Sequence, residues 1–228
     1  MLDQFADDIW IADGETVSVL GFHYPTRCAV IRLGGTDLLV WSPVALCADL
    51  KAQVDALGTV TYLIAPNHLH HFFVAQWQAA YPQAKLYAAP LLANKRPDLQ
   101  IDGTLCDTAE PVWAAFLDQA VLQNKLTTEV VFFHKPSGTV IFTDLIQQFP
   151  SGWHHGWRAL IARLDLMVGN APNVPCKFRL GFTNREQTRH QVQRILLWPI
   201  DRILMAHGQP VKQDGRAVLR RSFTWLLK

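Results

Sequence analysis

Residues 59–71 read TVTYLIAPNHLHH, an apolar run that ends among three histidines. Its first part, Thr59–Ala65, is apolar and β-branched, which is typical of a strand buried on both faces. A helical pattern over residues 72–81 and a short strand pattern at Lys85–Ala88 follow. This order predicts a βαβ-like unit. The histidines then lie at the C-terminal end of its first strand, where open α/β sheets bind ligands.

Before this unit the chain reads as a β-hairpin followed by a helix. RCAVIRL at residues 27–33 and DLLVW at residues 37–41 are strand-like, and Gly34–Gly35 between them favours a tight turn. After Ser42-Pro43, apolar residues recur at helical spacing until Gly58, which we expect to end the helix.

A second hairpin and a last strand are predicted further along. Residues 127–134 and 139–143 flank the turn sequence KPSG, and the outgoing strand leads into Asp144. We expect helices over residues 153–168, 184–198 and about 214–227, and a strand at residues 201–206 that ends in His207. No repeat or linker interrupts the pattern, which favours one domain over residues 1–228.

Composition excludes several classes of protein. The chain has 228 residues, of which 50% are hydrophobic and 18% charged, so it can bury a core and is not intrinsically disordered. A net charge of +2, with a basic cluster only near the C-terminus, argues against nucleic-acid binding. The four cysteines form no CxxC pair, and no signal peptide or spanning segment is expected. We therefore expect a cytoplasmic protein without a membrane partner; its oligomeric state stays open.

Residues suited to metal binding follow three of the predicted strands. They are the histidines at 68, 70 and 71, the carboxyl of Asp144, and His207. If these strands share one sheet, their C-terminal ends lie on one edge and the side chains converge. Imidazoles with one carboxylate suit zinc better than a hard ion such as magnesium. Taken singly, His207 is typical of a loop or core histidine and Asp144 of a turn or capping residue. The metal-site hypothesis therefore depends on the position that these residues share, directly after an apolar strand.

The order of these elements and motifs resembles the metallo-β-lactamase superfamily over nearly the whole chain. The resemblance rests on Ser42-Pro43, on the loop Pro66–His71 and on Ala206-His207-Gly208, and is nearest to a branch without an assigned function. It implies an α/β (α+β) fold of the four-layer αββα sandwich type and a metal-dependent hydrolase. The signature loop of the superfamily is His-x-His-x-Asp-His, whose residues serve two neighbouring metal sites.

Aligned with this loop, the chain keeps one metal site and loses the other. The first histidine becomes Pro66, the second is kept as His68, and a further histidine expected near Thr127 is missing. An early aspartate that normally braces the site is replaced by Ser42. The resemblance implies that the second site keeps four ligand-capable residues: His70 in place of the loop aspartate, His71, Asp144 and His207.

We therefore expect one zinc ion or none, with His68, His70, His71, Asp144 and His207 as metal-site residues and with Asp144 and His70 acting in catalysis. Four protein ligands would close a tetrahedral site, whereas catalysis needs a position for water. Glu129 and His134 could serve as a base or as partners of the ligands, or could be surface residues of the hairpin.

Three functions are consistent with these residues. The first is a hydrolase that uses one metal ion on a small-molecule substrate of unknown identity. The second is a non-catalytic binding or structural module that retains the fold, and the third is a non-hydrolytic metal enzyme. The sequence contains no Gly-x-Ser-x-Gly motif and no glycine-rich phosphate loop, so a serine hydrolase and a nucleotide cofactor are not expected.

Overall fold

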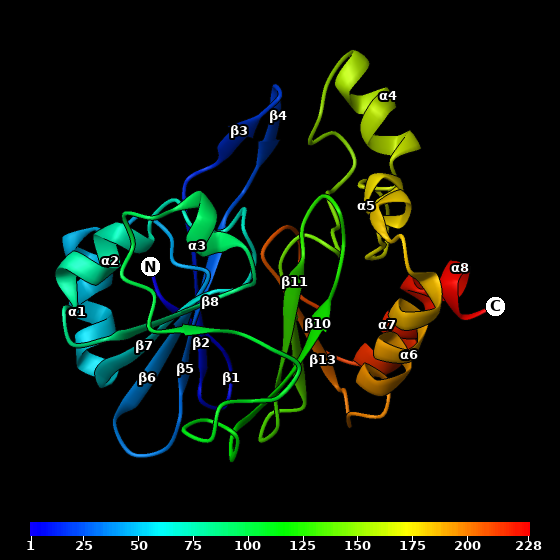
Figure 1. The fold of residues 1–228 in the computed structure, drawn as a ribbon. Coiled ribbons are helices and arrows are strands. Elements are labelled where there is room, and N and C mark those ends of the chain that lie inside the picture. The colour runs from blue at the N-terminus through cyan, green and yellow to red at the C-terminus, as the bar shows by residue number, and fades with distance from the viewer.

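A computed structural model describes residues 1–228, and two β-sheets packed face to face form its centre (Figure 1). The first sheet has seven strands in the order β1-β2-β5-β6-β7-β8-β9. Its strands are β1 (Asp3–Ala6), β2 (Ile9–Asp13), β5 (Arg27–Arg32), β6 (Asp37–Trp41), β7 (Thr59–Ala65), β8 (Lys85–Ala88) and β9 (Gly103–Thr104). Strands β6 to β9 run parallel, as the predicted βαβ-like unit requires.

The second sheet has four strands in the order β10-β11-β12-β13. Its strands are β10 (Leu117–Leu122), β11 (Glu129–His134), β12 (Thr139–Phe142) and β13 (Arg202–Met205). Strands β12 and β13 are parallel neighbours whose last residues, Phe142 and Met205, pair with each other. The loops after these two strands therefore leave the sheet side by side.

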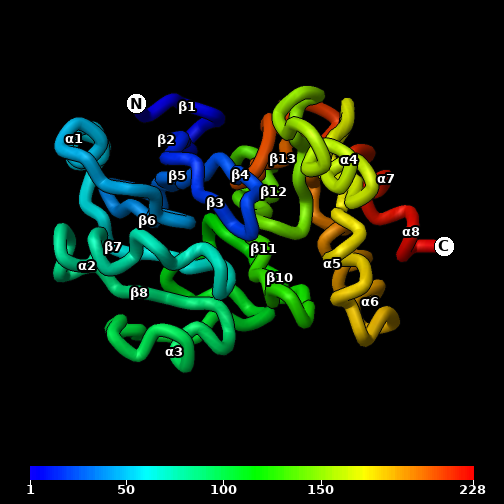
Figure 2. Tube along the Cα trace, turned by 90° about the horizontal axis from the view of Figure 1, so that it is seen from above, coloured from blue at the N-terminus to red at the C-terminus, as the bar shows by residue number.

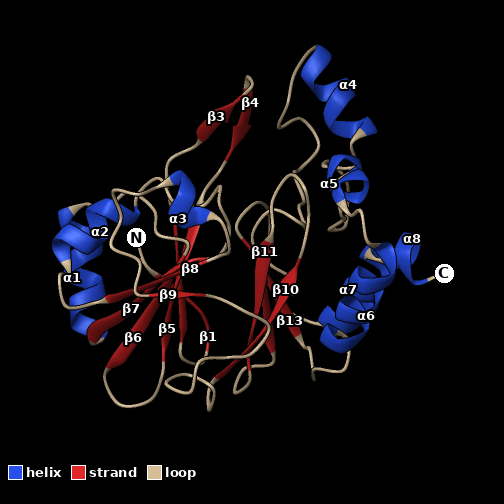
Figure 3. Cartoon of the chain, viewed as in Figure 1, coloured by secondary structure: helices blue, strands red, loops and turns tan.

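Helices cover the outer face of each sheet, which gives four layers (Figures 2 and 3). Helices α1 (Ala48–Leu57), α2 (Val74–Ala80) and α3 (Leu92–Lys95) lie on the side of the first sheet. The side of the second sheet carries α5 (Cys176–Gly181), α6 (Arg185–Ile195), α7 (Gly215–Ser222) and α8 (Thr224–Leu227). A short hairpin of β3 (Val17–Val19) and β4 (Phe22–Tyr24) and the helix α4 (Trp157–Leu164) project beyond these layers.

Three apolar clusters hold the layers together. One lies between the first sheet and its helices, and another between the second sheet and its helices. The third lies between the sheets and contains fully buried residues of both, including Trp41, Ile64, Phe132 and Leu204. Large side chains that leave water completely each contribute about 1.5–3 kcal/mol to folding. The predicted αββα sandwich is thus the observed architecture.

The strands and helices expected from the sequence are present, but two helices differ in extent. The helix expected over residues 153–168 is shorter, because α4 covers only Trp157–Leu164, and the one expected at about 214–227 is divided into α7 and α8. The short elements β1, β4, β9, α3 and α5 and the strand β10 were not foreseen. The expectation that the metal-binding residues follow strands of one sheet is wrong. His70 follows β7 of the first sheet, whereas Asp144 and His207 follow β12 and β13 of the second.

The two sheets meet at the loop that carries the histidines. The carbonyl of Pro66 accepts a hydrogen bond from the Val130 amide in β11, and Asn67 forms a bridge with Glu129. This contact brings the end of β7 against the ends of β11 and β12, so the candidate site lies at the rim between the sheets. None of the eight helices is both long and apolar enough to cross a membrane.

Candidate metal centre

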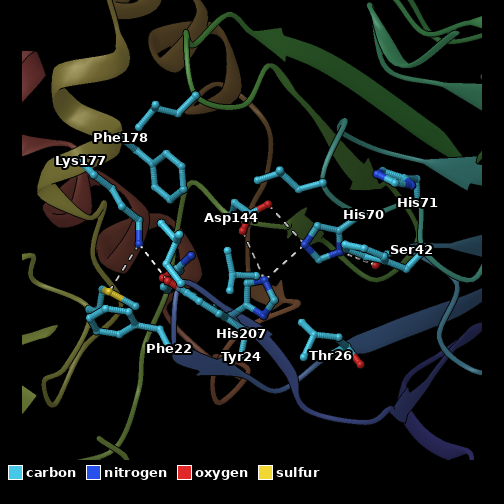
Figure 4. A pocket seen from close by; sticks show the side chains of 18 of the residues that line it. Phe22, Tyr24, Thr26, Ser42, His70, His71, Asp144, Lys177, Phe178 and His207 are labelled. Carbon is cyan, nitrogen blue, oxygen red and sulfur yellow. Dashed lines mark hydrogen bonds and ion pairs between the residues drawn. The ribbon is translucent and has the colours of Figure 1, made fainter. Parts of the chain in front are cut away.

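Two histidines and one carboxylate converge at this rim (Figure 4). The Nε2 atoms of His70 and His207 are 3.2 Å apart. His70 Nε2 lies 3.3 Å from Oδ2 of Asp144, and His207 Nε2 lies 3.3 Å from Oδ1 of the same carboxyl. All three side chains are more than 90% buried. The three side chains form a triangle of potential ligands, in which each imidazole approaches a different oxygen of the Asp144 carboxyl.

The outer nitrogen of each ring is hydrogen-bonded, which sets how the rings face the triangle. His207 Nδ1 donates to the backbone carbonyl of Pro25 at 2.7 Å, because a carbonyl can only accept. A neutral His207 then carries its proton on Nδ1 and presents a lone pair from Nε2. His70 Nδ1 lies 2.8 Å from Oγ of Ser42, a hydroxyl that can accept in the same way.

The residues that support the two rings have unusual backbone conformations. Ser42 is buried and adopts φ +52°, a left-handed conformation that is costly for a residue other than glycine. Gly208, directly after His207, has φ +130°, and a Cβ there would clash with the carbonyl oxygen of Gln148. The turn after β6 thus directs the hydroxyl of Ser42 to His70, and glycine is needed where the chain leaves His207.

Asn67 ties the histidine loop to Asp144. Its side-chain amide donates to Oδ2 of Asp144 at 2.7 Å and to the hydroxyl of Thr143 at 2.8 Å. Its carbonyl oxygen accepts from the backbone amides of Leu69 and His70. One fully buried side chain therefore orients a carboxylate from one sheet and a histidine from the other. The sequence analysis missed this role, although Asn67 stands beside a buried strand.

Glu129 supports the backbone around Asp144 from beneath. Its carboxylate accepts hydrogen bonds from the backbone amides of Thr143, Asp144 and Leu145. Burial raises the pKa of Glu129 to about 7, and the nearby charge of Asp144 adds to this effect. Glu129 is fully buried, so the alternative that it is a surface residue of the hairpin is wrong.

The electrostatics of the triangle favour a positive charge at its centre. Burial by itself would raise the pKa of Asp144, but interactions with His70 and His207 outweigh it and hold the pKa well below its usual range. The carboxyl is therefore ionised, and two imidazole nitrogens face the same point. Protons shared among these groups or a metal cation would supply the compensating charge.

The dimensions of the triangle fit a zinc ion. Ligand atoms in a tetrahedral zinc site lie about 2.0–2.1 Å from the ion, which places them about 3.3–3.4 Å from one another. The 3.2 Å between the two imidazole nitrogens and the 3.3 Å from each nitrogen to one oxygen of Asp144 are separations of this size, with a different carboxylate oxygen facing each ring. His70, Asp144 and His207 are thus suited, in atom type and in spacing, to hold one divalent ion.

His71 and His68, the other two predicted metal-site residues, do not join the triangle. The Nδ1 atom of His71 is 2.9 Å from the guanidinium of Arg96, and Figure 4 shows its ring apart from the other three side chains. The backbone carbonyl of His68 accepts a hydrogen bond from Lys95. Burial together with the charges of Lys95 and Arg96 lowers the pKa of His71 to about 4. Of the five predicted metal-site residues, His70, Asp144 and His207 therefore come together, and His68 and His71 do not.

His134, the other residue considered as a base or partner, is remote from the site. It ends β11 at the opposite end from Glu129, and its Nδ1 lies 2.8 Å from the hydroxyl of Ser137. It is fully buried rather than on the surface of the hairpin. Burial lowers its pKa to about 4.

A cavity of about 420 Å³ opens directly onto the triangle. The hairpin β3–β4, the histidine loop and the segment from α4 to α5 form its walls. Most of the residues that line it are apolar or aromatic, among them Phe22, Leu126, Ile161, Met167 and Phe178. Its volume is in the range of small-molecule binding sites. Residues 90–117 contribute nothing to these walls.

The fold is that of solved metallo-β-lactamases. A structure of the DIM-1 metallo-β-lactamase superposes with a TM-score of 0.69 at 10% identity, covering 99% of this chain and 95% of that one. FIM-1 from Pseudomonas aeruginosa, in its mono-zinc form, gives 0.63 at 10% identity, covering 100% and 96%. The metallo-β-lactamase from Erythrobacter litoralis gives 0.62 at 16% identity, covering 99% and 91%.

Comparisons of sequence are less informative. Residues 6–93 match the family model described as a domain of unknown function, DUF4336. No curated protein matches the chain by sequence. The resemblance predicted from the sequence is confirmed at the level of the fold: the chain is a metallo-β-lactamase-type αββα sandwich with a possible metal site at the rim between its sheets.

Proposed function

We propose that this chain is a metal-dependent hydrolase in which His70, Asp144 and His207 hold a single zinc ion. The observation that carries the proposal is the convergence of these side chains: the two imidazole nitrogens are 3.2 Å apart, and each lies 3.3 Å from one oxygen of Asp144. The hydrogen bond from His207 Nδ1 to the carbonyl of Pro25 supports it, because this bond leaves the inner nitrogen free to bind metal.

Three protein ligands, rather than the four expected from the sequence, favour catalysis over a structural role. Catalytic zinc sites use three protein ligands and leave a fourth position for water, whereas structural sites are closed. His71 would have been the fourth ligand, and it is engaged with Arg96 instead. When bound, zinc supplies a nucleophilic hydroxide at neutral pH by lowering the pKa of its water to about 7.

The protein groups around the triangle position the reaction. The carboxylate of Asp144 is fixed by Asn67, and the ring of His70 by Ser42, so neither needs to reorganise when substrate binds. The apolar cavity beside the triangle would hold the apolar part of a substrate next to these groups. Hydrolysis adds hydroxyl to the acyl or phosphoryl centre, and the leaving oxygen or nitrogen takes the proton.

A single-ion site is also consistent with a solved neighbour. FIM-1 is described in a mono-zinc form, so this fold accommodates one zinc ion. In our chain Lys95 and Arg96 lie beside His68 and His71, where their positive charges oppose a second cation. We therefore propose one ion per chain.

The test combines metal analysis with a substrate panel. Protein purified without chelator should contain about one zinc per chain and should hydrolyse at least one member of a panel of esters, lactams, thioesters and phosphodiesters. Chelation and Asp144→Asn should each abolish turnover, and zinc should restore it only in the unsubstituted chain. The matched control is Asp165→Asn, which changes another carboxylate of the cavity wall and should keep its zinc.

Two results would overturn the proposal. A chain that takes up no zinc under any loading condition would lack the metal site altogether. A chain that binds zinc but turns over no member of the panel would be a non-catalytic module that retains the fold, which is the second function considered from the sequence.

A further inference from the structure

The cavity beside the triangle is apolar over most of its surface, and its apolar lining continues to the outside. Leu20 and Phe72 line the cavity although they are 92% and 62% exposed, and Ile161 and Leu126 are each a little less than half exposed. Contiguous exposed apolar surface of this kind marks a binding site for an apolar ligand. An extended ligand could leave the triangle along this lining.

The charged residues of the cavity wall are already paired. The ammonium of Lys177 lies 3.3 Å from the carboxylate of Asp165 and 3.1 Å from the hydroxyl of Tyr24. Figure 4 shows Lys177 and Tyr24 on the side of the cavity away from His71. The remaining anion, Asp144, belongs to the triangle. Without a metal ion at the triangle, the wall therefore offers no free cation for a ligand carboxylate or phosphate.

One uncharged polar side chain of the wall lacks any partner. Gln147 lines the cavity, is 1% exposed, and has neither its amide nitrogen nor its carbonyl oxygen hydrogen-bonded. Its backbone is fixed by two hydrogen bonds with Asn173. A buried amide without hydrogen-bond partners is unfavourable, because it has lost its bonds to water and gained none. The carbonyl of an uncharged ligand would accept a hydrogen bond from the side-chain nitrogen of Gln147, and the N–H of an amide ligand could in addition donate to its oxygen.

We propose that the cavity binds an uncharged ester or amide with an extended apolar acyl chain. The chain lies along the apolar lining, and the carbonyl group is recognised by the side-chain amide of Gln147. Hydrolysis of the bound ligand rests on the proposed function, because His70, Asp144 and His207 would act on its acyl group. Binding itself requires only the cavity.

The first experiment measures binding without metal. Chelator-treated protein is titrated with the uncharged fluorophore N-phenyl-1-naphthylamine, which is then displaced by methyl octanoate or by methyl acetate. We expect methyl octanoate to displace the probe and methyl acetate to require concentrations at least about tenfold higher, because the longer chain buries more apolar surface. Equal displacement by both esters, or no binding of the probe, would overturn the proposal.

A matched pair of variants locates the binding. Ile161 and Leu160 are neighbours on α4 and both are exposed, but only Ile161 lines the cavity. Ile161→Asp should weaken displacement by methyl octanoate about tenfold, and Leu160→Asp should leave it unchanged. An effect of Leu160→Asp as large as that of Ile161→Asp would show that the probe binds the outer surface of α4 and would contradict the proposal.

The role of Gln147 is tested by the preference for a carbonyl group. Displacement by methyl octanoate is compared with displacement by decane, which has a similar length and no carbonyl. Gln147→Met should reduce the preference for the ester by about fivefold, the value of an ordinary hydrogen bond, while binding of decane is retained. A loss that is equal for both ligands would mean that Gln147 only supports the fold.

Failure of this inference can be told from failure of the proposed function. If the ligand binds as expected but zinc is not taken up, the hydrolase proposal fails and the cavity proposal stands. If zinc binds and short esters are hydrolysed while the octanoate ester has no advantage in binding or in kcat/KM, the cavity proposal fails alone.

Discussion

The two sides of the loop Asn67–His71 have opposite chemistry, although neighbouring residues form them. On one side His70 faces the carboxylate of Asp144 and the ring of His207. On the other side His71 faces the guanidinium of Arg96, and Lys95 binds the carbonyl of His68. The first side attracts a cation and the second already holds two cationic side chains.

This difference shows that the type of residue is a weaker guide than the charge it faces. His70 lies beside a carboxylate and is a potential metal ligand. His71 lies beside the guanidinium of Arg96, which keeps its ring neutral and able to accept a hydrogen bond. The orphaned Nε2 of His71 is buried and has no partner in the protein, yet its ring does not reach the triangle. The comparison predicts one metal site per chain, on the side of His70.

The largest expected effect comes from removing a ligand on the metal-binding side. His70→Ala should weaken zinc binding more than about a hundredfold, because it removes one of three protein ligands. The matched control is His71→Ala, the adjacent residue of the same type, which should bind zinc as the unsubstituted chain does. Elemental analysis and competition with a chromogenic chelator measure both. If His71→Ala lost zinc and His70→Ala kept it, the metal site would lie on the His71 side of the loop, which would contradict the proposal.

A smaller effect is expected from the residue that connects the two sheets at the site. Asn67→Ala removes the hydrogen bonds to Asp144 and to the backbone of His70, so the ligands lose their orientation. Zinc affinity should fall by about 10–100-fold, as is usual for partners of metal ligands. Unfolding in urea serves as the control, since a folded variant with unchanged zinc affinity would show that Asn67 is only structural.

The sequence was informative about the fold and about three of the site residues, for a physical reason. Apolar strands and the turn signals of Gly34–Gly35 are local, and His70, Asp144 and His207 directly follow such strands. The position of His71 depends on Arg96, which lies 25 residues further along, and this contact leaves no local signal. The role of Asn67 was missed because its hydrogen bonds join different sheets. Glu129 was considered as a partner of the ligands, and the structure shows it holding the backbone amide of Asp144 within the second sheet.

The pKa of His134 is lowered by burial alone, whereas the pKa of His71 is lowered by burial and by neighbouring cations together. Burial lowers the pKa of His134 to about 4, and no arginine or lysine contributes to this shift. An unfolded histidine titrates near 6.5, so between these values the unfolded chain binds more protons. The stabilising effect of the neutral ring is therefore complete above about pH 6.5 and is lost as the pH falls toward 4.

Replacing His134 should make the chain less sensitive to acid. On lowering the pH from 7 to 4.5, the unsubstituted chain should lose about 2 kcal/mol more unfolding free energy than His134→Leu. Urea denaturation at the two pH values measures this difference. An equal loss in both chains would mean that the buried ring of His134 is not the group that titrates.

The smallest effect is expected from the cationic side of the loop. Arg96→Gln removes the hydrogen bonds from the guanidinium to the ring and to the carbonyl of His71. The unfolding free energy should fall by about 1 kcal/mol, while the dissociation constant for zinc should change by less than about twofold. Because the triangle does not use His71, a tenfold change in zinc affinity would show that the two sides of the loop are coupled after all.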